Sequence, residues 1–246
     1  MLLVNGTLRK VKFMHKRVIL KLSGEALSGD TDKAFDNQTI NNFVLQIKQV
    51  IEKGVELCIV VGGGNFWRGR SANEKMDRTK ADQIGMMATI MNAIYLSDSL
   101  AQNDIKSVVM TPFVVGAMTE QFNKQSALKH LKHKKVLIFA GGIGHPFFST
   151  DTITALRACE LEADAILFAK SIDGVYDKDP AKYSDAKKFD EIPCKDIVEK
   201  NLQVIDIAAA SLCYEHKIPV IIFGLLEENS IVKASIGEKI GTIVTI

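Results

Sequence analysis

The chain has 246 residues, of which 47% are apolar and 24% are charged, as in an ordinary globular protein. Its formal net charge of +2 gives no basis for wholesale binding of nucleic acid, and the basic run at 129–135 is short enough to be a solvated helix end. No apolar run approaches the roughly 20 residues of a membrane span, and no signal peptide is recognisable. We therefore expect neither nucleic acid nor a membrane among the partners.

The cysteines and histidines form no metal-binding or disulfide pattern. The cysteines are far apart, form no CxxC pair and mostly lie in apolar runs: Cys58, Cys159, Cys194 and Cys213. This pattern is typical of buried, reduced thiols and predicts a cytoplasmic protein. Because His130, His133 and His216 also lack metal-ligand spacing, no protein-held metal is expected.

Strand-like and helix-like segments alternate along most of the chain. Residues 1–13 carry neither pattern and are expected to be a disordered extension before one domain at 14–246. The expected strands are residues 17–22, 55–61, 106–111, 135–140, 164–169, 218–223 and 241–246, and the expected helices are residues 36–53, 82–102, 120–132, 151–162 and 206–216. This alternation predicts an α/β fold with a mostly parallel sheet covered by helices on both faces.

Three of the expected strands end in a glycine-containing turn. The first ends with Lys21 and a Ser-Gly turn, the second runs into three glycines at 62–64 and then Arg68, and the fourth runs into the segment 140–151. Loops at the carboxyl ends of parallel strands lie on the same edge of a sheet. The three turns therefore predict one shared crevice, and a polyphosphate is the simplest ligand that would need all of them.

The segment 140–151 has the features of an anion site. Gly141, Gly142 and Gly144 can adopt positive φ and let backbone N–H groups approach a ligand. Ser149 or Thr150 can cap the helix that follows, and the helix dipole adds partial positive charge there. A tight strand-to-helix turn without a ligand is the alternative interpretation of this segment alone.

The polar stretch at 173–190 is expected to be a surface loop that contributes to the ligand site. The chain contains no GxxxxGK[ST] motif and no GxGxxG followed by an acidic residue after the next strand, which argues against a P-loop and a dinucleotide site. Three separate glycine turns favour two phosphorylated ligands placed end to end. That arrangement is a phosphoryl-transfer site.

Several motifs, in order from about residue 16 to the C-terminus, resemble the bacterial uridylate kinases, the UMP-specific branch of the amino acid kinase superfamily. They are KLSGEAL at 21–27, GGGN at 62–65 with Arg68, MDR at 76–78, AD at 81–82, GMMAT at 85–89, PFFSTD at 146–151, VY at 175–176 and DP at 179–180. The resemblance implies a three-layer α/β sandwich with an acceptor-binding half at about 14–163 and an ATP-binding half at about 164–246. It also implies transfer of the ATP γ-phosphoryl group to UMP, Mg²⁺ carried with ATP, and a homohexamer.

The resemblance assigns roles to individual residues. Lys21, Arg68 and Asp151 are expected to act in catalysis: Lys21 bridges the transferred phosphoryl group, Arg68 holds phosphates of both nucleotides, and Asp151 orders the lysine ammonium groups. The implied ATP site consists of Lys21, Leu22, Ser23, Gly24, Gly64, Arg68, Lys170, Tyr176 and Asp179. The implied UMP site consists of Gly63, Asp82, Ile143, Gly144, His145, Pro146, Phe147, Phe148, Ser149 and Thr150.

Each assignment has a simpler alternative. Lys21 alone is compatible with a solvated strand end, Arg68 with a surface arginine, Asp151 and Asp82 with first-turn helix acids, and Asp179 with an Asp-Pro turn. Lys170 falls where the family varies. At the pyrimidine base the family reads Gly-Thr-Gly-Asn-Pro where this chain has Ile143 and His145, and only His145 offers a polar side chain. Two other functions stay open: another small-molecule kinase of the superfamily and a non-catalytic nucleotide binder.

Overall fold

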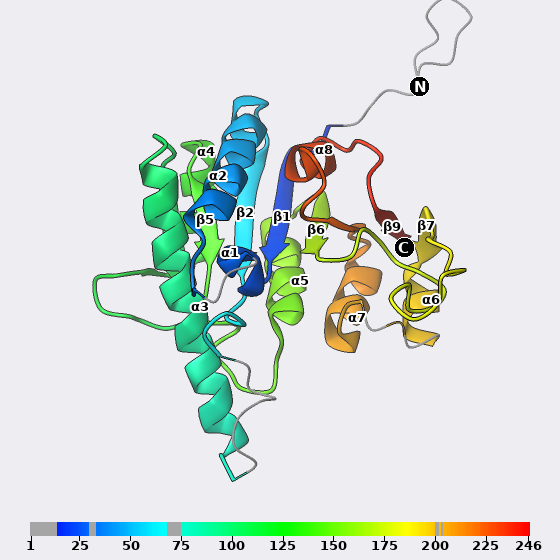
Figure 1. The fold of residues 1–246 in the computed structure, drawn as a ribbon. Helices are drawn as coiled ribbons and strands as arrows, with labels where there is room; N and C mark the ends of the chain where they lie inside the picture. The colour runs from blue at the N-terminus through cyan, green and yellow to red at the C-terminus, as the bar shows by residue number, and fades with distance from the viewer. Residues whose placement is uncertain (1–13, 30–32, 68–74, 200–201, 203) are drawn as a thin grey trace, which may run out of the picture.

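The apolar runs form the strands of one nine-stranded sheet in the computed structural model, which describes residues 14–29, 33–67, 75–199, 202 and 204–246 (Figure 1). The strands are β1 (Arg17–Leu22), β2 (Glu56–Val61), β3 (Ser107–Thr111), β4 (Glu120–Gln121), β5 (Val136–Phe139), β6 (Ala165–Lys170), β7 (Glu191–Pro193), β8 (Val220–Gly224) and β9 (Thr242–Thr245). The helices are α1 (Glu25–Ser28), α2 (Asn37–Glu52), α3 (Arg78–Ala101), α4 (Lys124–Lys132), α5 (Thr150–Leu161), α6 (Cys194–Glu199), α7 (Ile207–His216) and α8 (Ser230–Ser235).

The sheet order is β4-β3-β5-β2-β1-β6-β8-β9-β7, and every pairing is parallel except that of β8 with β9. The predicted mostly parallel α/β fold is therefore confirmed. The expected extension at 1–13 lies outside the described residues. Within the described part of the chain, no helix has both the length and the apolar character needed to cross a bilayer.

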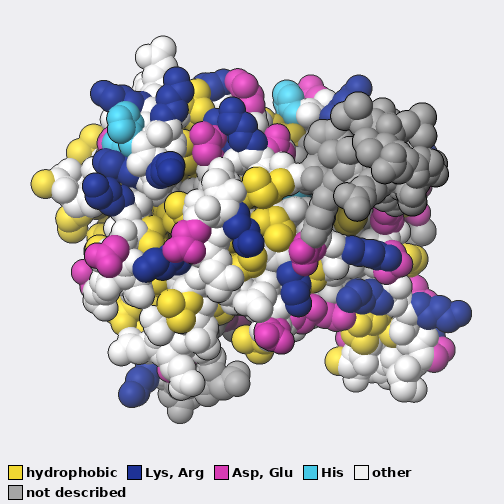
Figure 2. Space-filling view, turned by 90° about the horizontal axis from the view of Figure 1, so that it is seen from above, with side chains coloured by type: hydrophobic (Ala, Val, Ile, Leu, Met, Phe, Trp, Pro, Cys, Tyr) yellow, Lys and Arg dark blue, Asp and Glu magenta, His cyan; other side chains and the backbone are white. Residues whose placement is uncertain are grey.

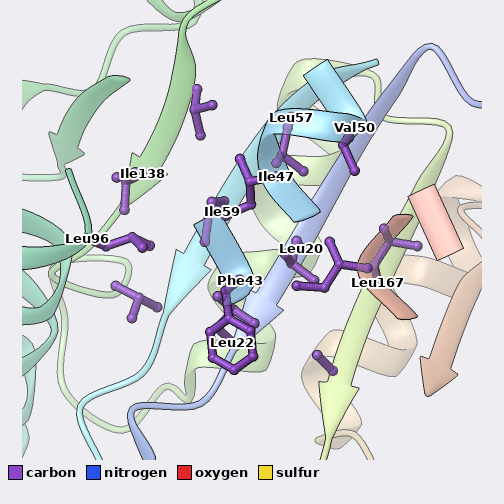
Figure 3. Close-up of a cluster of buried hydrophobic side chains, with 14 of the residues drawn as sticks. Leu20, Leu22, Phe43, Ile47, Val50, Leu57, Ile59, Leu96, Ile138 and Leu167 are labelled. Atoms are coloured by element: carbon purple, nitrogen blue, oxygen red, sulfur yellow. The ribbon is translucent and has the colours of Figure 1, made fainter. Parts of the chain in front are cut away.

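Alternate residues of the central strands enter two separate cores. Val18, Leu20 and Leu22 of β1 pack with α2, α3 and α8 on one face, where Figure 3 shows Leu20 and Leu22 close to Phe43. Ile19 points the other way, into a second core formed with α4, α5, α6 and α7. Because side chains of a strand alternate between faces, Lys21 belongs to the face covered by α5. The helices thus cover both faces, as the sequence predicted.

Some element boundaries were predicted wrongly. The expected helix at 120–132 is interrupted, because Glu120–Gln121 pairs with β3 as β4, and the helix begins only after Asn123, whose side chain accepts hydrogen bonds from two N–H groups of α4. The expected helix at 82–102 starts earlier, because the Asp77 carboxylate caps it through the N–H of Lys80 at 3.1 Å. In both cases a polar capping residue decided where the helix begins.

The edge of the sheet at which the strands begin carries a mixed surface. Seen from above in Figure 2, basic and acidic side chains are interspersed with apolar ones over this face rather than separated by sign. This distribution agrees with the low net charge of the chain. The loops that carry the expected ligand groups lie at the opposite edge (Figure 1).

Candidate active site

The three glycine turns meet at the carboxyl edge of the sheet. β5, β2 and β1 are consecutive and parallel, so the loops that follow them are neighbours. The turns after β1 and β2 are in contact: a Cβ atom added to Gly24 would lie 2.5 Å from the backbone nitrogen of Gly64, and one added to Gly62 would lie 2.9 Å from that of Gly24. Only glycine permits this approach, and the predicted common edge is present.

The loop after β5 has the backbone that its glycines predicted. Gly141, Gly142 and Gly144 have φ of 78°, 57° and 87°, in the left-handed region that favours glycine. The loop ends at Ser149, whose Oγ accepts a hydrogen bond from the N–H of Asp151 at 2.9 Å and so caps α5. Of the two caps considered from the sequence, Ser149 is the one observed.

Helix α3 supports two of the glycine turns through buried polar side chains. Asn92 Nδ2 donates to the carbonyl of Gly62 at 2.6 Å and to Asn65 Oδ1 at 2.8 Å. Thr89 Oγ1 accepts from the N–H of Gly141 at 2.7 Å. Sequence reasoning missed the roles of Thr89 and Asn92, although two polar residues three positions apart on an otherwise apolar helix face are a usable signal.

The centre of the site is a carboxylate between two lysines. Asp151 Oδ1 lies 3.2 Å from Lys21 Nζ, and its Oδ2 lies 3.8 Å from Lys170 Nζ. β1 and β6 are adjacent, and strand alternation places both lysines on the face covered by α5. Lys21 is only 8% exposed, so the solvated strand-end alternative does not apply to it.

Burial shapes the electrostatics of this centre. The pKa of Lys170 is lowered, chiefly because burial disfavours its charged form, while the Asp151 carboxylate opposes that shift. Asp151 Oδ1 is itself buried and accepts no hydrogen bond from any described residue. The positive charges beside this carboxylate are the ammonium groups of Lys21 and Lys170.

A smaller cavity, of about 150 Å³, lies at the start of α5. It is lined by several of the residues expected to bind UMP: Gly63, Asp82, His145, Phe148, Ser149 and Thr150. Ile143 does not line it and packs against the core on the α5 side. Gly144 lies against Pro112, where an added Cβ would be 3.1 Å from the proline ring. The structure therefore separates His145, which faces the cavity, from Ile143, which does not.

Asp82 anchors the aromatic part of the loop. Its Oδ2 accepts a hydrogen bond from the N–H of Phe147 at 2.8 Å, and both its oxygens accept from Arg78 Nε at 2.9 Å. Phe147 has φ of 71°, which is uncommon for a residue with a side chain, and its ring is exposed near the Arg78 guanidinium. The Asp82 carboxylate thus holds the backbone of Phe147 in this conformation.

A larger cavity, of about 780 Å³, is lined by Asp151 itself. Lys170 and Asp206 line it together with apolar residues of α6 and α7. Phe148 and Ser149 line both cavities. The two cavities therefore adjoin at these two residues, and Asp151 and Lys170 of the central cluster line the larger one.

The remaining residues expected at the ATP site are less connected to this centre. Tyr176 donates its hydroxyl to Asp173 at 2.8 Å, and Asp179 accepts from the N–H of Ala181 at 3.0 Å, so both make contacts inside the 173–190 loop. Leu22 is buried, and its carbonyl accepts from the N–H of Gly62 at 2.9 Å. Ser23 accepts from the N–H of Ala26 through Oγ at 3.2 Å. Arg68 lies outside the described residues.

Known proteins share this fold over most of the chain. The model of the amino acid kinase family matches residues 16–224. A solved structure of UMP kinase from Bacillus anthracis is 36% identical, with a TM-score of 0.91 over 94% of this chain and 96% of that one. A UMP kinase from Ureaplasma parvum is 35% identical, with a TM-score of 0.89 over 94% and 99% of the two chains. Uridylate kinase from Archaeoglobus fulgidus is 29% identical, with a TM-score of 0.72 over 93% and 99%.

Proposed function

Because the chain belongs to the amino acid kinase family, we propose that it transfers the γ-phosphoryl group of ATP to UMP, giving UDP and ADP, as a step of pyrimidine nucleotide biosynthesis. The names of its structural neighbours, UMP kinase and uridylate kinase, support UMP as the acceptor. The observation that carries the proposal is the pair of cavities that share Phe148 and Ser149, the larger of which is lined by Asp151 and Lys170 of the Lys21–Asp151–Lys170 centre.

The chemistry requires charge neutralisation more than proton transfer. The attacking oxygen of UMP is already anionic, so no general base is needed, and catalysis consists of positioning and electrostatic stabilisation. ATP and UMP together bring roughly six negative charges at neutral pH, since the second phosphate pKa is near 6. Lys21 and Lys170 provide positive charge beside Asp151, and the glycine turns provide backbone N–H groups. Arg68 is proposed to contribute a further guanidinium.

The acceptor is proposed to occupy the smaller cavity, called the acceptor-side cavity from here on, and ATP the larger one, called the donor-side cavity. Asp82 and His145 line the smaller space, where a carboxylate can accept from ribose hydroxyls and an imidazole can pair with the base. Lys170 lines the larger one. The proposed ATP site also includes the turn from Lys21 to Gly24, with Gly64, Tyr176 and Asp179.

Magnesium is proposed to arrive with ATP as part of the substrate. Within the described ranges, no three His, Cys, Asp or Glu side chains gather in a way that could hold a metal ion. Asp151 already lies between two ammonium groups. Phosphate oxygens of ATP are suitable Mg²⁺ ligands and can supply the coordination that the described side chains do not.

A homo-oligomer, a homohexamer by family resemblance, is proposed as the assembly. Four apolar side chains on α3 at helical spacing are exposed: Ile84 (39%), Met87 (48%), Met91 (46%) and Ile94 (38%). A row of this kind on a long helix supports packing against another copy.

A cytoplasmic location is proposed on the basis of the four cysteines, none of which forms a disulfide.

An ADP-release assay with UMP, CMP, dTMP and carbamate as acceptors tests the function. We expect ATP turnover that depends on UMP. Turnover with carbamate instead would indicate another small-molecule kinase of the family. Nucleotide binding without turnover of any acceptor would indicate a non-catalytic nucleotide binder.

A further inference from the structure

Asp206 connects two helices whose N-termini border the donor-side cavity. It precedes α7, and its Oδ1 accepts a hydrogen bond from the N–H of Ala209 at 2.7 Å, as an N-cap does. Its Oδ2 accepts hydrogen bonds from the hydroxyls of Ser149 and Thr152, the second at 3.0 Å. One carboxylate therefore caps its own helix and also holds the start of α5.

Ser149 links Asp206 to the backbone of Asp151 through two hydrogen bonds. A serine hydroxyl has one hydrogen, and Ser149 donates it to Asp206. Its Oγ therefore accepts hydrogen bonds from the N–H of Asp151 at 2.9 Å and from the N–H of Thr152 at 3.4 Å. The carboxylate of Asp206 thus fixes the hydroxyl that caps α5, two residues before Asp151, which lies between the two lysines.

The charge of Asp206 acts on the same centre. Asp151, Lys170 and Asp206 line one cavity. Burial is the main influence that lowers the pKa of Lys170, while Asp151 and, more weakly, Asp206 favour its charged form. Without Asp206, the start of α5 would lose an anchor and Lys170 would lose one of its two compensating charges.

We propose that Asp206 is a positioning residue of the phosphoryl-transfer site: through Ser149 it fixes the start of α5, and with it Asp151, against the half of the chain that carries Lys170. The proposal rests on the kinase function proposed above. It assigns to Asp206 an effect on the rate of the chemical step rather than on the binding of either nucleotide.

The informative substitution is Asp206→Asn. Asparagine keeps a carbonyl oxygen for the N–H of Ala209, so the α7 cap remains, but it removes the charge and puts an NH2 group, a donor, where the oxygen that accepts from Ser149 lies. Steady-state kinetics would compare the unmodified protein with Asp206→Asn, Ser149→Ala and the double variant. We expect each single change to lower kcat about tenfold or more, with either KM changed by less than about threefold. The double variant should lose no more than the worse single one, because both changes break one link.

Asn123→Ala is the matched control, because it tests the loss of a helix N-cap that has only a structural role. It removes the N-cap of α4, which makes no contact with the two cavities, and should lower Tm by about 2–4 °C while kcat stays unchanged. Unchanged kcat in Asp206→Asn, losses that multiply in the double variant, or a change in KM alone would overturn the proposal.

Assaying the unmodified protein first distinguishes failure of the proposed kinase function from failure of the proposed role of Asp206. If no acceptor is phosphorylated, the proposed function fails. The coupling of positions 149 and 206 is then measured by thermal unfolding of the same four proteins. Non-additive losses in Tm support the link through Ser149, and additive losses overturn it.

Discussion

The loop after β5 and the loop after β6 leave the same edge of the sheet but are held in different ways. The β5 loop is fixed by other elements: Thr89 of α3 at its start, Asp82 of α3 in its middle and Asp206 at its end. The loop at 173–190 is fixed mainly by contacts within itself.

The internal contacts of the 173–190 loop are charged. Asp173 accepts from Lys188 at 2.7 Å and from Tyr176 at 2.8 Å, and Lys178 pairs with Asp185 at 2.6 Å. Thr242 of β9 links the loop to the sheet, since its Oγ1 accepts from Val175 and donates to Phe189. The loop after β5 is therefore held by the helical framework, whereas the 173–190 loop is held by its own charged contacts and by β9.

The largest effect is expected at Lys21, whose ammonium nitrogen lies 3.2 Å from Asp151 Oδ1. Because Lys21 is buried, Lys21→Met is preferable to Lys21→Ala: it keeps the packing and removes only the charge. Loss of one such contact lowers kcat on the order of 10²–10³-fold. Kinetics with UMP and ATP check this, and Lys106→Met, at the exposed start of β3, is the control. Near-normal turnover of Lys21→Met would contradict the kinase proposal as stated.

The fold was more predictable from the sequence than the site, for identifiable reasons. Strand alternation and apolar runs are local signals, and they located β1, β2, β5 and β6 to within a residue or two. β4 and β7 were missed because they have only two or three residues and depend on pairing rather than on pattern.

The supporting residues of the site could not be identified from local pattern. Asn92 and Thr89 lie in a helix far along the chain from the turns that they hold, and Asp206 looks in sequence like an ordinary N-cap. Their roles depend on which elements the fold brings together. Glycines and the capping serine were predictable because their backbone requirements are local.

A second, smaller effect is expected from Asp82→Asn on the acceptor side. The amide cannot accept both the Phe147 N–H and the Arg78 guanidinium as a carboxylate does, so the aromatic loop loses its anchor. We expect KM for UMP to rise about tenfold while KM for ATP changes little. Asp98→Asn, at the other end of α3, is the control and should leave KM for UMP and KM for ATP unchanged. Equal increases for both nucleotides would show that the two sides are not independent.

A third prediction concerns the base. His145 lines the acceptor-side cavity and Ile143 does not, so discrimination between uracil and cytosine should depend on position 145. We expect UMP to be preferred over CMP, His145→Ala to narrow that preference, and Ile143→Thr with His145→Asn to keep UMP turnover within about tenfold. The preference is measured as the ratio of kcat/KM for UMP to kcat/KM for CMP. Ile143→Val should leave that ratio unchanged, and a ratio unaffected by His145→Ala would remove this residue from base recognition.

The smallest effect is expected in the 173–190 loop, from Lys188→Met. The change removes a partner of Asp173 on a part-exposed surface, so it should cost less than about 1 kcal/mol of unfolding free energy and raise KM for ATP no more than about threefold. Lys239→Met, which breaks a more exposed pair with Asp190, is the control and should change neither quantity.

The effect of Lys188→Met should also depend on pH. The hydrogen bond from Lys188 is the largest cause of the lowered pKa of Asp173. A carboxyl whose pKa is lowered by folding stabilises the protein above its ordinary pKa and ceases to do so as the pH falls through the lowered value. The difference in unfolding free energy between Lys188→Met and the unmodified protein should therefore shrink at acid pH, and a difference that grew there would mean that Lys188 acts through packing and not through Asp173.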